Sequence, residues 1–196
     1  MSEQNNLFLA LEYALRGWLV FPTHAIVEGH CTCNNSSCGS KGKHPLSPHG
    51  FKDASRDNTI IEKWWGQHPH ANVAVRTGKE SGLVVVDIDP CNGGDESLQH
   101  LFSLFDEFPR TPVVYTGGDG IHFYFAYPHK GPEIKCTANL CGLPGIDIKA
   151  EGGYVVAPNS THISGQTYRW AMDNHVAGIN AAPLPPWLLE HLIITK

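Results

Sequence analysis

The sequence has no apolar segment long enough to cross a membrane. A membrane-spanning helix needs about 20 consecutive, mostly apolar residues, and no such run occurs among the 196 residues of the chain. The first residues, MSEQNNLFLA, also lack the basic segment and the cleavage site of a secretory signal peptide. We therefore expect a cytoplasmic protein with reduced thiols and no membrane contact.

An excess of positive charge is also missing. The chain has 14 Lys and Arg against 19 Asp and Glu, a formal net charge of −5, which argues against a protein that coats nucleic acid through bulk electrostatics. A local basic groove remains open, as does an enzyme that obtains positive charge from metal ions. Hydrophobic residues at 41% and charged residues at 17% predict a globular chain. The 20 glycines and 14 prolines favour a sheet-rich α+β fold over a helical bundle.

Residues 83–89, LVVVDID, form the strand around which the chain is organised. Valine and isoleucine favour a packed strand, and alternation places Asp87 and Asp89 on one face of it, with Val86 and Ile88 on the other. Two neighbouring carboxylates repel each other, and a cation between them removes that cost. Oxygen ligands of this kind suit Mg²⁺ or Mn²⁺. The alternative, in which the aspartates cap the strand and begin a turn, is the commoner meaning of Asp-x-Asp taken alone.

A cysteine-rich loop at about residues 29–46 has the spacing of a zinc site. Cys31, Cys33, Cys38 and His44 give the pattern C-x-C-x4-C-x5-H within a loop of Gly, Ser and Asn that has too few apolar residues to pack by itself. Thiolates and imidazole are zinc ligands, and four protein ligands leave no position for substrate, so we expect a structural Zn²⁺. His30 is the alternative fourth ligand. The other interpretations are a disulfide, which a reducing cytosol disfavours, and free surface thiols, which a chain normally avoids at such density.

The remaining elements follow from apolar spacing and capping residues. A strand at 71–78 is expected to share a sheet with 83–89. Helices are predicted at 6–16 with Asn6 as N-cap, 59–65 capped by Asp57 or Asn58, 96–108 capped by Asp95, and 187–192.

Two glycine-rich hairpins are predicted after the Asp-x-Asp strand. In residues 113–125 the turn contains Gly118 and Gly120, which allow a backbone to approach a ligand closely. His122 opens the second strand, where it could meet phosphate oxygens, although a histidine at a strand start is more often structural. In residues 145–158, Asp147 and Lys149 share one strand face; a simple salt-bridged aspartate is the alternative there.

Together these strands supply three carboxylates, one histidine, one lysine and two glycine-rich turns. Three carboxylates that hold two divalent cations suit in-line phosphoryl or nucleotidyl transfer. The same set would suit a metal-dependent nuclease or phosphohydrolase. A third hypothesis is a non-catalytic DNA-binding module organised by the zinc loop.

The ordered series of motifs resembles the bifunctional primase-polymerase (prim-pol) domain of the archaeo-eukaryotic primase superfamily. The matching stretches cover nearly the whole chain and occur in the order of the family. They are ALRGWLVFP, GSKGKHP, WW with ANVAVRTG, VVVDIDP, YTGGDGIHFYF, GIDIKAEGGYVVAPNS and PLPPWLLEHL. The resemblance implies one catalytic domain over residues 1–196, with an α/β N-terminal part, an RRM-like sheet and an active-site cleft between them.

The same resemblance implies roles for individual residues. Asp87, Asp89 and Asp147 would hold the catalytic Mg²⁺ or Mn²⁺ ions and His122 would contact the incoming triphosphate, while Arg76 and Lys149 are further candidates for phosphate contacts. The implied activity is template-directed synthesis and extension of a primer on DNA from ribo- or deoxyribonucleoside triphosphates. Many relatives continue into a helicase region, and the implied setting is a bacterium, phage or plasmid.

Overall fold

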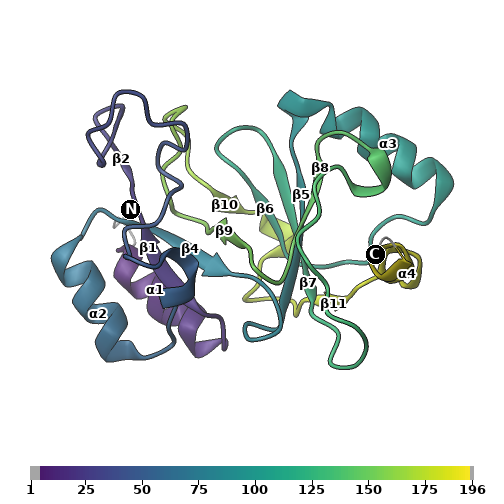
Figure 1. Ribbon diagram of the computed structural model, residues 1–196, viewed down its shortest axis with the longest axis horizontal. Coiled ribbons are helices and arrows are strands. Elements are labelled where there is room, and N and C mark those ends of the chain that lie inside the picture. The colour runs from purple at the N-terminus through teal and green to yellow at the C-terminus, as the bar shows by residue number, and fades with distance from the viewer. Residues whose placement is uncertain (1–4, 195–196) are drawn as a thin grey trace. The chain divides into compact units, whose positions relative to one another are not determined.

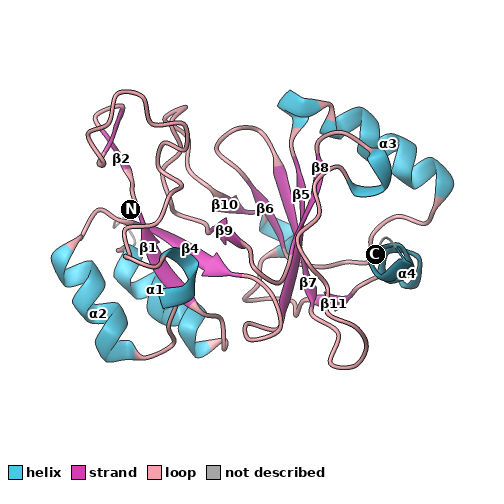
Figure 2. Ribbon diagram, viewed as in Figure 1, coloured by secondary structure: helices cyan, strands magenta, loops and turns pink. Residues whose placement is uncertain are grey.

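The computed structural model describes residues 5–194, which form an α+β fold with antiparallel sheets (Figure 1). The chain divides into two compact units. The first contains residues up to Arg76, residues 116–118 and residues Tyr154–Arg169, and the second contains the rest. Figure 2 shows that helices and strands occur in both units. Within residues 5–194, none of the helices combines the length and the apolar character that crossing a bilayer requires.

The first unit is built on a three-stranded antiparallel sheet in the order β1-β4-β9. Strands β1 and β4 are buried along nearly their whole length, and α1 and α2 pack on them through Tyr13, Ile61 and Trp65. Asn5 and Asp57 cap the two helices by accepting hydrogen bonds from backbone N–H groups of the first turn. The elements are α1 (Asn6–Leu15), β1 (Val20–Thr23), α2 (Asn58–Gln67), β4 (Asn72–Arg76) and β9 (Tyr154–Val156).

The cysteine-rich loop also belongs to the first unit. A two-stranded ribbon, β2 (Ile26–Val27) and β3 (His30–Cys31), opens it, and a 3₁₀ turn, η1 (Gly50–Asp53), follows it. Backbone hydrogen bonds join the loop to its unit, from His24 N to His44 O at 2.9 Å and from Leu46 N to Pro22 O at 3.0 Å.

The second unit is built on a larger sheet in the order β10-β6-β7-β5-β8, with β11 parallel to β7. The Asp-x-Asp strand, β5, lies between β7 and β8 and pairs antiparallel with both. The strands are β5 (Leu83–Ile88), β6 (Val113–Tyr115), β7 (Ile121–Ala126), β8 (Ile146–Lys149), β10 (Arg169–Trp170) and β11 (Ala182–Pro183).

One face of the larger sheet is apolar, and the opposite face, which we call the polar face, carries polar side chains as well as the buried residues Val85 and Tyr124. Val84, Val86 and Ile88 of β5 join Ile146 and Ile148 of β8 in the core cluster of this unit. Helices α3 (Gly94–Leu104) and α4 (Pro186–Ile194) lie on the same side of the sheet (Figure 1), and Leu101 and Leu188 bring them into that cluster. The residues that alternate with the apolar ones therefore point to the opposite face. Three short 3₁₀ turns, η2 (Pro90–Asn92), η3 (Leu140–Gly142) and η4 (Met172–Asn174), connect the elements of this unit.

Most predicted elements are confirmed, with small shifts at their ends. The N-cap of α1 is Asn5 and not Asn6. Helix α3 begins at Gly94, so Asp95 lies in its first turn and does not cap it. The same helix ends four residues earlier than predicted because the backbone of Phe105 is extended.

Two predictions about strand pairing are wrong. The strand at 71–78 does not share a sheet with 83–89, because β4 pairs with β1 and β9 whereas β5 pairs with β7 and β8. Residues 145–158 do not form a hairpin, since β8 and β9 belong to different sheets. Alternation identifies a strand, but the partner of a strand depends on contacts distant in sequence.

Candidate active site and zinc site

A row of three polar residues crosses the polar face of the larger sheet. Asp87 of β5 lies directly opposite His122 of β7 on one side and directly opposite Asp147 of β8 on the other. Residues directly opposite in an antiparallel pair project from the same face. The three side chains therefore lie side by side in the order Asp147, Asp87, His122, and we call this set the carboxylate row. The Nε2 atom of His122 lies 3.4 Å from Oδ1 of Asp87.

Lys149 adds a cation to this row. It lies two residues after Asp147 on β8, hence on the same face, and its Nζ atom donates to Asp147 Oδ2 at 2.8 Å and lies 3.6 Å from Asp87 Oδ2. Burial by itself would lower the pKa of Lys149, but the hydrogen bond to Asp147 and the charges of Asp87 and Asp147 together raise it above its usual value. The contribution of this cation to stability is therefore present below the ordinary lysine pKa and is lost only as the pH rises through the raised one.

The row is accessible to a small ligand. About 25% of the Asp87 side chain and 33% of the Asp147 side chain are exposed, against 7% for His122. Ionised carboxylates only accept hydrogen bonds, so two of them side by side form a site for cations. With Lys149 and His122 beside them, the arrangement can hold a divalent cation together with the phosphate oxygens of a ligand.

Asp89 has a different environment from the other two aspartates. It follows the last residue of β5, and its side chain caps η2 by accepting from Cys91 N at 3.0 Å and from Asn92 Nδ2 at 2.6 Å. The side chain of Asp89 therefore begins a turn, as the alternative interpretation of Asp-x-Asp expects, whereas Asp87 belongs to the row. Across the described part of the chain, only the cysteine loop has three or more Cys, His, Asp or Glu ligand atoms that all lie within 4.8 Å of one another. The three carboxylates are thus not gathered that closely.

Two glycines that we did not predict hold the backbone of Asp89. Asp89 N donates to Gly145 O at 2.8 Å, and Gly94 N donates to Asp89 O at 2.9 Å. A Cβ atom on Gly94 would lie 2.7 Å from Asp89 O, and one on Gly145 would lie 2.5 Å from Gly94 N, both too close for any side chain. The signal in the sequence is the Gly93-Gly94 pair, which lies in the turn after the strand.

Asn139 is another contributor that sequence reasoning missed. Its backbone N–H donates to Asp147 Oδ1 at 3.1 Å, and its side-chain oxygen accepts from Gly145 N at 3.3 Å. Asn139 and Lys149 thus donate to different oxygens of the Asp147 carboxylate, Oδ1 and Oδ2. No pattern in the sequence points to it, because the contact depends on the path of a loop.

The other predicted nucleotide-binding residues are divided between the units. Arg76 ends β4 in the first unit, where its guanidinium carbon lies 5.8 Å from the centre of the Phe51 ring. Gly118 is also in the first unit, and its N–H donates to Thr116 Oγ1 at 3.3 Å. Gly120 is in the second unit, immediately before β7 and two residues from His122. The roles of Arg76, Gly118 and Gly120 in ligand binding remain predictions.

The cysteine loop brings its four predicted ligands together. The ligand atoms of Cys31, Cys33, Cys38 and His44 all lie within 4.8 Å of one another, and Cys38 Sγ lies 3.7 Å from His44 Nδ1. His30 does not belong to this group of ligand atoms, so the geometry favours His44 as the fourth ligand. All three cysteines are free thiols, which contradicts the disulfide interpretation. Three thiols and an imidazole at this spacing fit Zn²⁺.

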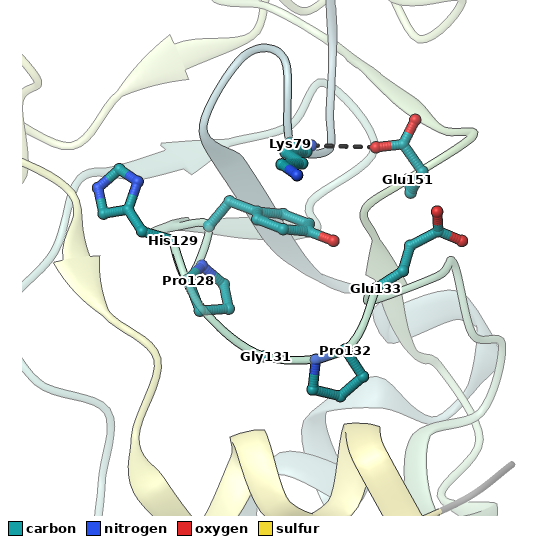
Figure 3. Close-up of a pocket in the computed structure, with 8 residues that line it drawn as sticks. Lys79, Pro128, His129, Gly131, Pro132, Glu133 and Glu151 are labelled. Atoms are coloured by element: carbon teal, nitrogen blue, oxygen red, sulfur yellow. Dashed lines mark hydrogen bonds between the residues drawn. The ribbon is translucent and has the colours of Figure 1, made fainter.

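A small cavity of about 120 Å³ lies elsewhere in the second unit. Figure 3 shows it between Lys79 and Glu151 on one side and the loop that carries His129 and Glu133 on the other. The backbone N–H of Lys79 donates to Glu151 Oε2 at 3.1 Å (Figure 3). None of the residues of the carboxylate row lines this cavity, so the cavity is separate from the candidate active site.

The sequence matches a known protein family. Residues 10–187 match the family model described as "Bifunctional DNA primase/polymerase, N-terminal". The match includes the carboxylate row, Asp89 and the cysteine loop. No curated protein matches the sequence significantly.

Proposed function

The chain belongs to the bifunctional DNA primase/polymerase family, and on that premise we propose that it transfers nucleotides from nucleoside triphosphates to make or extend a primer on a DNA template. The observation that carries the proposal is the row Asp147, Asp87, His122 with Lys149 beside it. A nucleotidyltransferase needs acceptor oxygens for divalent cations next to donors for phosphate oxygens, and the row supplies both on one face of one sheet.

Asp87 and Asp147 are the proposed ligands of the catalytic Mg²⁺ or Mn²⁺ ions, with Asp89 as the third. The carboxylates of the row are partly exposed and project from adjacent strands, which fits a bridging cation. When bound, two such ions supply activation of the attacking 3′-hydroxyl and neutralisation of charge on the leaving pyrophosphate. To be the third ligand, the carboxylate of Asp89 would give up the hydrogen bond that it accepts from Asn92.

His122 and Lys149 are the proposed phosphate contacts. His122 is almost fully buried and is held opposite Asp87 by the register of β5 and β7, so its ring is positioned before the ligand arrives. Lys149 keeps its proton at neutral pH because its pKa is raised. In the free protein the ammonium offsets the repulsion between Asp87 and Asp147, and with cations bound it becomes available to a triphosphate oxygen.

The zinc loop is proposed as a structural element. Four protein ligands leave no open coordination position, and hydrogen bonds such as His24 N to His44 O and Asn72 Nδ2 to Gly42 O join the loop to its unit. The DNA template and primer, the choice between ribo- and deoxyribonucleotides, and a helicase as partner belong to the proposal and follow from the family alone.

Primer extension tests the proposal. The full chain is incubated with a primed DNA template, labelled ribo- or deoxyribonucleoside triphosphates, and Mg²⁺ or Mn²⁺, in parallel with Asp87→Asn and Asp147→Asn. We expect each variant to lose more than the roughly 10–100-fold that removing an outer-shell partner of a metal costs. Glu133→Gln, an exposed carboxylate of the same unit, is the matched control and should extend primers normally.

The same assay separates the alternatives. Equal incorporation by wild type and Asp87→Asn would refute the proposed role of the row. Cleavage of DNA without added triphosphates would instead support a metal-dependent nuclease. An unprimed template distinguishes synthesis of a new primer from extension alone.

A further inference from the structure

Aromatic rings continue the polar face of the larger sheet beyond His122. The ring centres of His122 and Tyr124 are 6.3 Å apart, those of Tyr124 and Trp170 are 5.3 Å apart, and those of Trp170 and His175 are 5.4 Å apart. All four residues belong to the second unit. The rings therefore form a continuous series that leads from the carboxylate row toward the edge strand β10.

Trp170 is the ring in this series that can meet a ligand with a broad aromatic surface. Tyr124 is fully buried, so it supports Trp170 from within, whereas Trp170 is only partly buried and His175 is exposed. The planes of Tyr124 and His175 are inclined to the indole by 57° and 55°.

The segment that follows Trp170 is held in place by Arg110. The guanidinium donates from Nη2 to Asp173 O at 2.7 Å and from Nε to Asn174 Oδ1 at 3.3 Å. Ala171 N donates to Val113 O of β6 at 2.8 Å. The backbone that follows Trp170 is thus fixed on the sheet before any ligand binds, which reduces the entropy that binding would cost.

We propose that Trp170 is a stacking platform for an unpaired nucleobase whose phosphates lie at the carboxylate row. Aromatic rings stack with every base, so such a platform tolerates any sequence. The ring centre of Tyr124 lies 5.3 Å from that of Trp170 and 6.3 Å from that of His122. The indole and the imidazole are therefore no farther apart than these two distances together, which one nucleoside triphosphate can bridge. The base can come from the incoming nucleotide or from a DNA strand. The proposal rests on the proposed function, because it places the phosphates at the row.

Equilibrium binding of three probes tests the platform without turnover. The probes are ATP, inorganic triphosphate and a single-stranded DNA oligonucleotide, each with Mg²⁺. The proteins are the wild type, Trp170→Leu, which keeps an apolar side chain against Tyr124 but has no ring, and Trp170→Phe. Trp64→Ala, which removes a partly buried indole from α2 in the other unit, is the matched control, and thermal unfolding verifies that each variant is folded.

We expect Trp170→Leu to weaken binding of ATP, of the oligonucleotide, or of both by about fivefold to a hundredfold, the range that stacking of one base contributes. Trp170→Phe should retain most of the affinity, and inorganic triphosphate should bind wild type and Trp170→Leu equally. A loss for ATP alone identifies the incoming nucleotide as the source of the base, and a loss for the oligonucleotide alone identifies the DNA strand.

Unchanged binding of both base-containing probes by Trp170→Leu would overturn the proposal. The wild-type protein alone can also overturn it. This would follow if wild type bound ATP no more tightly than inorganic triphosphate and did not bind the oligonucleotide. These outcomes are separate from those of the primer-extension assay. Incorporation that depends on Asp87 with unchanged binding by Trp170→Leu refutes the platform alone, and base-dependent binding without incorporation refutes the enzyme alone.

Discussion

The ammonium of Lys149 donates to the carboxylate of Asp147 at 2.8 Å, on the strand next to Asp87. Since Asp87 lies directly opposite Asp147, the lysine is the charge that lets two carboxylates share one face of the sheet. A divalent cation would perform the same task. The negative charges of Asp87 and Asp147 are therefore offset by Lys149 in the free protein and would be offset by the divalent cation in the metal-bound protein.

Replacing Lys149 with Met should destabilise the metal-free row and leave the metal-bound row nearly unaffected. Without added Mg²⁺ or Mn²⁺, we expect the free energy of unfolding to fall by about 1–2 kcal/mol, because two partly buried carboxylates lose a charged donor. Saturating Mn²⁺ should recover most of that loss. Denaturant unfolding of the zinc-loaded protein with and without Mn²⁺ measures both values.

Lys135→Met is the control for this prediction. Lys135 is 69% exposed and pairs with Glu133 at 3.6 Å, so its loss should change stability by less than about 0.5 kcal/mol under either condition. A loss in Lys149→Met that Mn²⁺ does not reduce would show that the carboxylates do not take up the cation.

Asp89→Asn separates a capping role from a catalytic one. Asparagine caps a helical turn about as well as aspartate, so the free energy of unfolding should change by less than about 0.5 kcal/mol. If Asp89 is a metal ligand, primer extension should nevertheless fall by more than about 100-fold, since an amide binds a divalent cation far more weakly than a carboxylate does. Unfolding and primer-extension measurements on one preparation give both numbers.

Asp57→Asn is the matched variant for that comparison. Asp57 caps α2 in the same way, by accepting from Thr59 N at 2.8 Å, and belongs to the other unit. It should leave both stability and extension unchanged. Normal extension by Asp89→Asn would confine Asp89 to its structural role and leave Asp87 and Asp147 as the ligands.

Local pattern was sufficient to place most of the candidate residues on their elements. Alternation put Asp87, His122 and Asp147 on strands, with their apolar neighbours on the other face, and the structure confirms each placement. The cysteine spacing identified four residues whose ligand atoms do gather. These features depend on residues close together in sequence, where steric and periodic rules are strong.

The pairing and register of strands that are distant in sequence could not be predicted from the sequence. The sequence does not specify that Asp87 faces both His122 and Asp147, because register is decided by the packing of whole strands. The same limit led us to join residues 145–158 in one hairpin. Alternation also placed Asp89 on the strand, whereas Gly94 and Gly145 bind its backbone beyond the strand end and turn its side chain to η2.

Removing one ligand of the zinc loop should unfold that loop. We expect Cys38→Ala to contain less than one equivalent of zinc and to lower the free energy of unfolding by more than about 4 kcal/mol, a size typical of losing a metal. Elemental analysis and denaturant unfolding check the two effects. Cys91→Ala, an exposed thiol outside the cluster, should keep its zinc and its stability. Less than one equivalent of zinc in carefully purified wild-type protein would contradict the assignment.

Asn72 connects three segments of the first unit through a side chain that is fully buried. Its Nδ2 atom donates to Gly42 O at 2.9 Å, in the cysteine loop, and to Thr161 O at 2.8 Å, while its Oδ1 atom accepts from Thr161 N at 2.9 Å. Together with a bond from the Thr161 hydroxyl at 3.2 Å, these contacts use the full hydrogen-bonding capacity of the amide.

Asn72→Ala should therefore be among the most destabilising single substitutions in the first unit. It removes one donor from the buried Gly42 carbonyl and three hydrogen bonds from the partly buried Thr161. Because an unsatisfied buried group costs about 1–3 kcal/mol, we expect a loss of about 3 kcal/mol in denaturant unfolding. Asn58→Ala, at an exposed helix position, should change stability by less than about 0.5 kcal/mol. Because Asn72 joins β4 to the cysteine loop, its loss should also speed the release of zinc to a chelator. Wild-type stability with wild-type zinc release in Asn72→Ala would show that the loop is held by its metal alone.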